Sequence, residues 1–165
     1  MFLLSKVVAG NQTYVYSQGT KKIDIMSKAP NDHRKFVMDV VCNDSQRHSI
    51  TLNHRYNNNL IIRRLCMSNH KHRNPKKIPD DMPYELKLLL TPYKNEILPC
   101  PHIHILQNSP WGNWAIPANV KIDINKNITV NDVINNMKLF FKYCNIDWGH
   151  NIINIYDGSY ISIEW

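Results

Sequence analysis

The stretch Lys35-Phe36-Val37-Met38-Asp39-Val40-Val41 is rich in β-branched and aromatic residues, the types that favour strands. Asn43-Asp44-Ser45 follows it as a turn signal, and residues 48–56 predict a second strand. Asn57-Asn58-Asn59 supplies residues that tolerate left-handed turn conformations, and residues 60–67 predict a third strand. Three strands joined by short turns predict an antiparallel meander.

The C-terminal third predicts one amphipathic helix, which begins with the capping-box-like pair Thr129 and Asp132. Its apolar stripe consists of Val130, Val133, Ile134, Met137, Phe140, Phe141 and Cys144. The opposite face carries Asn131, Asn135, Lys138 and Lys142. A helix with this pattern should pack on a sheet.

Asp157-Gly158 separates two short β-rich runs and predicts a terminal β-hairpin. We therefore expect the α+β class: a curved antiparallel meander sheet, with one main C-terminal amphipathic helix packed on it and the hairpin at the end. The length of 165 residues and the hydrophobic content of 43% fit a single domain over residues 1–165.

The net charge of +7 favours either simple solubility or an anionic partner, with equal weight. The best candidate for a positive patch, and for contact with nucleic acid, consists of Arg63, Arg64, Lys71, Arg73, Lys76 and Lys77. No stretch approaches the roughly 20 apolar residues that span a bilayer, and the N-terminus lacks a signal-peptide pattern. We expect a cytoplasmic protein with no membrane partner, in which cysteines stay reduced.

The run Cys100-Pro101-His102-Ile103-His104-Ile105 carries the sharpest chemical signal. In a strand, alternate side chains share a face, so His102 and His104 should point one way and the isoleucines toward the core. A His-x-His pair on a strand can hold one metal ion. The alternative is that both histidines are hydrogen-bonded surface residues, and Cys100 with a neighbouring histidine could also form a nucleophile pair.

A second cluster, Cys66-Met67-Ser68-Asn69-His70-Lys71-His72, lies where the third predicted strand ends and could supply the remaining ligands from a loop. Mixed thiol and imidazole ligands suit Zn²⁺, in a closed structural site more than in a catalytic one. The candidate ligands are Cys66, His70, His72, Cys100, His102 and His104, and the sequence leaves open which four bind. We expect Cys42 and Cys144 to be core residues.

A different constellation is typical of metal-independent ribonucleases, which need a general base, a general acid and a cation. Residues of these types here are His54, Arg55, Tyr56, Arg63, Arg64 and His72. Trp111 and Trp114 could stack on bases, or could cover the edge of a core. No glycine-rich phosphate loop, dinucleotide fingerprint or nucleophile elbow is present, so we expect no nucleotide cofactor.

Four short runs form a pattern across residues 60–146: His72-Arg73-Asn74-Pro75, Pro101-His102-Ile103-His104-Ile105, Trp114-Ala115 and Phe141-Lys142-Tyr143-Cys144-Asn145-Ile146. The pattern resembles a family of small uncharacterised proteins from low-GC Gram-positive bacteria and their phages and mobile elements. Where that family has Asp-Gly after Asn-Pro, this chain has Lys76-Lys77, so the charge of the loop differs. The resemblance singles out His72, His102 and His104 as one group.

The habitat that this resemblance implies brings two functions forward. The first is a phage or mobile-element protein that binds and inhibits a host defence protein, such as an anti-CRISPR protein acting on Cas9. The second is an RNA-cleaving toxin of a toxin–antitoxin pair. The missing catalytic motifs favour the inhibitor, and hence a protein that is not an enzyme.

Overall fold

A computed structural model describes residues 5–10, 13–16, 19–43, 49–57, 59–67, 71–107, 109–124, 130–149, 152–156 and 160–163. Within these residues the protein is mixed α/β, with a large, mostly antiparallel sheet and two α-helices. In this part of the chain, no helix has both the length and the apolar character that a membrane crossing requires.

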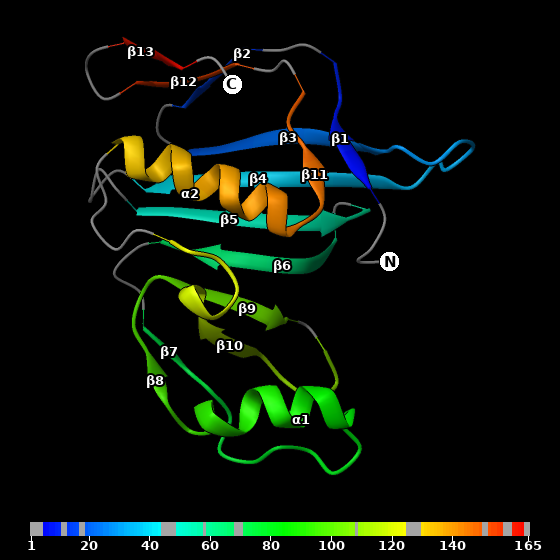
Figure 1. Cartoon of the computed structure of the whole chain (residues 1–165), viewed down its shortest axis with the longest axis vertical. Coiled ribbons are helices and arrows are strands. Elements are labelled where there is room, and N and C mark those ends of the chain that lie inside the picture. The colour runs from blue at the N-terminus through cyan, green and yellow to red at the C-terminus, as the bar shows by residue number, and fades with distance from the viewer. Residues whose placement is uncertain are drawn as a thin grey trace.

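The large sheet has eight strands among the described residues, in the order β10-β9-β6-β5-β4-β3-β1-β11 (Figure 1). Their bounds are β1 Lys6–Val8, β3 Gly19–Ser27, β4 Lys35–Asn43, β5 Ser49–Tyr56, β6 Leu60–Cys66, β9 His102–Leu106, β10 Trp114–Pro117 and β11 Ile146–Asp147. All neighbouring pairs are antiparallel except β1 and β11, which run parallel.

The predicted meander is present as β4, β5 and β6 at the centre of this sheet. Asn57 has a φ of 49° in the turn between β5 and β6, the left-handed conformation expected of the asparagine run. The strand β3 extends the meander on one side, and β9 returns to β6 on the other. The sequence does not predict this return, because it joins segments far apart in the chain.

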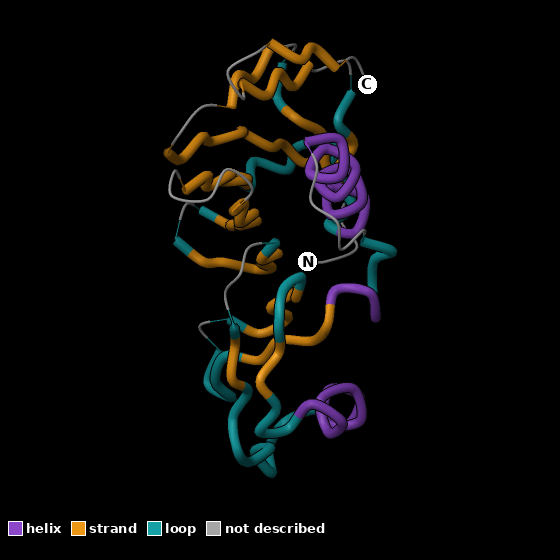
Figure 2. The backbone as a smooth tube through the Cα atoms, turned by 90° about the vertical axis from the view of Figure 1, so that its left-hand side faces the viewer, coloured by secondary structure: helices purple, strands orange, loops and turns teal. Residues whose placement is uncertain are grey.

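Helix α2 (Val130–Tyr143) lies across one face of the large sheet (Figures 1 and 2). Alternate residues of the central strands, such as Met38 and Leu52, are buried against its apolar stripe. The buried residues of that stripe are Ile134, Met137, Phe140, Phe141 and Cys144. The side chains of Val130 and Val133, and Thr129 of the predicted cap, lie outside the described part.

The C-terminal end of α2 is capped by cations. Lys6 Nζ donates a hydrogen bond to the Cys144 carbonyl at 2.9 Å, and Arg63 donates one to the Tyr143 carbonyl. Asn145 ends the helix with a φ of 56°. Positive charge at these carbonyls complements the negative end of the helix dipole.

A second sheet, three-stranded in the described residues, has the order β13-β12-β2 and lies at one end of the molecule (Figure 1). Its strands are β2 Thr13–Tyr16, β12 Ile152–Tyr156 and β13 Tyr160–Ile163. The strands β12 and β13 pair antiparallel, and the predicted turn residues Asp157 and Gly158 between them lie outside the described residues.

The described residues within 71–117 form a smaller unit at the other end, which we call the α1 lobe (Figure 1). It contains β7 (His72–Arg73), α1 (Tyr84–Leu90), the 3₁₀ turn Thr91–Tyr93, β8 (Ile97–Leu98), β9 and β10. A second apolar cluster of Met82, Leu90, Trp114 and Ile116 fills it. A further 3₁₀ turn, Ala118–Val120, leads back toward α2.

Candidate metal centre

The α1 lobe joins the rest of the large sheet through the ladder between β6 and β9, which we call the seam. Three residue pairs make up this ladder in the described structure, whereas eight pairs join β4 to β5. At the central pair, Leu65 and Ile103 are buried on the α2 side of the sheet. Side chains alternate across a sheet, so Cys66, His102 and His104 share the opposite face.

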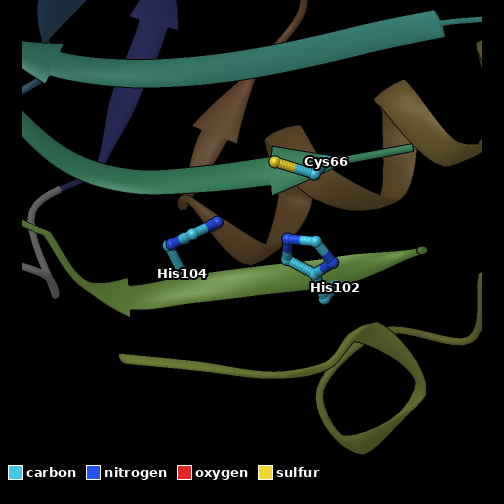
Figure 3. Close-up of side chains that lie close together, drawn as sticks. All are labelled: Cys66, His102 and His104. Carbon is cyan, nitrogen blue, oxygen red and sulfur yellow. The ribbon is translucent and has the colours of Figure 1, made fainter. Parts of the chain in front are cut away.

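These three side chains lie close together on this face of β6 and β9 (Figure 3). One ligand atom from each lies within 4.8 Å of the other two. Zinc–ligand distances place neighbouring ligand atoms of a tetrahedral site about 3.5 Å apart. Only 3% of Cys66, 1% of His102 and 7% of His104 is exposed. A buried group of one thiol and two imidazoles at this spacing can bind a metal ion.

Burial also keeps the imidazole of His104 in the form that binds metals. Desolvation, followed by the charges of the neighbouring His72, His102 and Arg64, lowers the pKa of His104 to about 3. The ring is therefore neutral near pH 7. Its Nδ1 is buried and has no hydrogen-bond partner among the described residues, which is costly unless a partner is supplied.

The thiol of Cys66 needs a counter-charge before it can act as a thiolate. Burial raises its pKa, and the opposing influences come from Arg64 and from a side-chain hydrogen bond with Thr51. Thr51 is the direct cross-strand neighbour of Cys66. A bound cation would displace the thiol proton, and Thr51 and Arg64 would then stabilise the sulfur as outer-shell partners.

The imidazole of His102 is oriented by a backbone carbonyl. Its Nδ1 lies 3.1 Å from the oxygen of Pro99, which can only accept, so Nδ1 carries the proton. The other ring nitrogen, Nε2, is then the one at which a metal would bind. A ligand histidine that donates its second N–H to a carbonyl is the common arrangement in metal sites. Cys100 Sγ lies 3.6 Å from the same Nδ1.

The structure places the other candidate ligands around this group. His72 on β7 lies beside it, with its ring centroid 4.5 Å from that of His104 and 5.8 Å from that of His102. Cys100 precedes β9 and is joined to Pro101 by a cis peptide bond. His70 lies outside the described residues. Cys66 is the last residue of β6, inside the strand that the sequence predicts over residues 60–67.

The reasoning from sequence missed Thr51, Arg64 and Pro99 as supporting groups. Residues of these types are common and carry no local signal. Only the register could have identified them, because Thr51 becomes a neighbour of Cys66, and Arg64 a neighbour of His104, once β5, β6 and β9 are aligned.

The residues of the ribonuclease hypothesis fall on different faces of the sheet. His54 is 2% exposed on the α2 side, where its ring lies 5.7 Å from that of Phe36. Desolvation, followed by the charges of Lys6 and Arg63, lowers the pKa of His54 to about 3. Arg55 points the other way and forms an ion pair with the buried Asp39.

The candidate basic patch is also divided. Lys71, Arg73, Lys76 and Lys77 are exposed on the α1 lobe. Arg63 instead turns toward α2, where its guanidinium lies 4.2 Å from the centre of the Tyr143 ring. Of the two candidate stacking residues, Trp114 is fully buried and donates its indole N–H to the Trp111 carbonyl at 2.9 Å.

Residues 1–146 match the family of unknown function DUF6978, so the chain belongs to this uncharacterised family. This agrees with the resemblance to an uncharacterised family. No curated protein and no solved structure matches the chain.

Proposed function

We propose that the protein holds one structural zinc ion through Cys66, His102 and His104. The observation that carries the proposal is the convergence of their ligand atoms within 4.8 Å in a buried position. A thiol with two imidazoles is a ligand type that zinc shares with few other common ions. The site lies at the seam, where a cross-link between β6 and β9 would add most to the short ladder.

We further propose that this metal-stabilised protein is a phage or mobile-element accessory protein that binds and inhibits a host defence protein. A CRISPR effector nuclease such as Cas9 is the candidate target. The exposed lysines and arginine of the α1 lobe, Lys71, Arg73, Lys76 and Lys77, support a binding role because they offer a cationic surface to an acidic partner. Burial of His54 gives the ribonuclease alternative less support.

Two experiments test the two parts of this proposal. Elemental analysis of untagged protein should find about one zinc per chain, and a chelator should remove it and lower the melting temperature. The absence of metal, with no effect of the chelator, would contradict the zinc site.

The inhibitory role is tested by titrating the protein into a Cas9 cleavage assay. Inhibition should weaken when Lys76 and Lys77 are both replaced by Glu, while the same replacement of the exposed Lys21 and Lys142 serves as the control for charge alone. Cleavage that continues unchanged at saturating protein would contradict this target.

A further inference from the structure

The three-ligand group leaves one corner of a zinc tetrahedron to be filled, and two side chains lie close enough to compete for it. They are His72 and Cys100. A closed site with four protein ligands is structural, whereas a site with three ligands and water can be catalytic. The identity of the fourth ligand therefore decides what kind of site this is.

The position of Cys100 does not favour it. Its sulfur lies 3.6 Å from Nδ1 of His102, the nitrogen that also faces the Pro99 carbonyl. Since Nδ1 is the protonated nitrogen, a metal would bind at Nε2, whose lone pair points in a different direction. Cys100 thus lies next to the ring nitrogen that would not bind the metal.

His72 lies beside the group, next to both of its histidines. Its ring meets that of His104 edge-on at a centroid distance of 4.5 Å. Its Nε2 is buried and has no hydrogen-bond partner among the described residues. Nδ1 of His72 is therefore the nitrogen that makes the hydrogen bonds with the Asn113 backbone and the Asn74 side chain. Nδ1 is held by the protein in both His72 and His102, so Nε2 is the ring nitrogen that would bind a metal.

We infer that His72 is the fourth ligand, and that a metal ion held by Cys66, His72, His102 and His104 fastens the α1 lobe to the large sheet. The inference rests on the proposed zinc site. Cys66 belongs to β6 of the main sheet, whereas the three histidines belong to β7 and β9 of the α1 lobe. The ion would bind β7 to the seam. It would also hold β8 in place, because β8 is the only strand that pairs with β7 in the described part of their sheet.

Cobalt binding tests this assignment, because a tetrahedral Co²⁺ ion with a thiolate ligand absorbs strongly in the visible range. We would titrate Co²⁺ into metal-free wild-type protein and three variants: His72→Gln, Cys100→Ser and, as a matched control, His33→Gln at an exposed turn. In His72→Gln, affinity should fall by more than the roughly 10- to 100-fold that loss of an outer-shell partner causes. The tetrahedral spectrum should weaken, while the other two variants should match the wild type.

Hydrogen exchange on the same proteins tests the fastening. Metal removal from the wild type should accelerate exchange of the amides in β7 and β8 and leave those of β4 and β5 unchanged. Metal-loaded His72→Gln should show the same local acceleration in β7 and β8. Unchanged exchange in β4 and β5 would establish that the variant is folded.

The outcomes separate the two proposals. If the wild type binds no cobalt, the zinc site itself is overturned. If the wild type binds cobalt and His72→Gln matches it in affinity and spectrum, the zinc site stands and the role of His72 is overturned. A loss seen in Cys100→Ser in place of His72→Gln would assign the fourth position to Cys100 and also overturn the inference.

Discussion

The core beneath α2 and the seam between β6 and β9 are held together in different ways. Beneath α2, long strands pair over eight residues and aromatic and aliphatic side chains fill the space. At the seam, three residue pairs join the strands, and the face away from α2 carries a thiol and imidazoles. Apolar burial therefore stabilises the first region, and we propose that metal ligation stabilises the second.

The largest expected effect comes from removing a buried apolar side chain beneath α2. Phe140 is fully buried at the centre of the α2 stripe. Phe140→Ala should lower the free energy of unfolding by about 3–5 kcal/mol through lost burial and the cavity left behind. Urea unfolding measures this change, and the zinc content of the folded variant should equal that of the wild type. A loss below about 1 kcal/mol would mean that α2 contributes little to the core.

Removing a proposed metal ligand at the seam should give the next largest effect. Cys66→Ser should abolish zinc binding, and at free zinc 100 times the dissociation constant this should lower the free energy of unfolding by about 2.7 kcal/mol. Calorimetric melting with and without a chelator measures it, and the chelator should have no further effect on the variant.

Cys144→Ala is the matched control for Cys66→Ser, because it removes a buried thiol from the α2 core instead of the seam. This variant should keep its zinc and its response to the chelator. Loss of zinc in both variants would show that the thiol of Cys66 has no special role.

The outer edge of the α1 lobe depends on a single amide. Asn74 accepts a hydrogen bond from the Ala115 amide at 2.9 Å and donates to the Ala115 carbonyl at 2.8 Å, as a neighbouring strand would. Asn74→Ala would leave both buried groups unpaired and should cost about 2 kcal/mol. Hydrogen exchange of the Ala115 amide should accelerate, and an unchanged rate would contradict this role.

A smaller effect depends on pH and arises in the α2 core. His54 has a pKa of about 3 in the folded protein against an ordinary value of 6.5, because it is buried near Lys6 and Arg63. As the pH falls below 6.5, the unfolded chain binds this proton first, so stability declines until the pH approaches 3. The slope from one such group is at most about 1.4 kcal/mol per pH unit.

Replacing His54 tests this pH dependence. His54→Leu should reduce the slope of stability against pH below 6.5 relative to the wild type, because it removes the group that titrates from 6.5. His33→Gln, a change at an exposed turn, should keep the wild-type slope. Urea unfolding at several pH values measures both, and equal slopes in the His54→Leu and wild-type proteins would contradict the assignment.

Local sequence patterns predicted the elements whose signals are local. The strand residues 35–41 and the asparagine turn led directly to β4, β5 and β6, and alternation in the run 100–105 placed His102 and His104 on one face. The same reasoning placed Cys144 in the core.

What could not be predicted depends on how distant segments align. The pairing of β9 with β6 brings Cys66 opposite His102, although 36 residues separate them, and no local pattern encodes that register. Arg63 and Arg64 look alike in the sequence, but alternation along β6 sends the first to α2 and the second to the metal face. The position of Thr51 opposite Cys66 follows from the alignment of β5 with β6.

X-ray absorption spectroscopy at the zinc edge of the zinc-loaded wild-type protein tests the central claim most directly. We expect one sulfur ligand at about 2.3 Å and three nitrogen ligands at about 2.0 Å. Cys66→Ser should lose the sulfur contribution, whereas Cys144→Ala should keep it. A spectrum without sulfur, or a protein that retains no zinc, would contradict a metal centre built from Cys66 and the histidines of the seam.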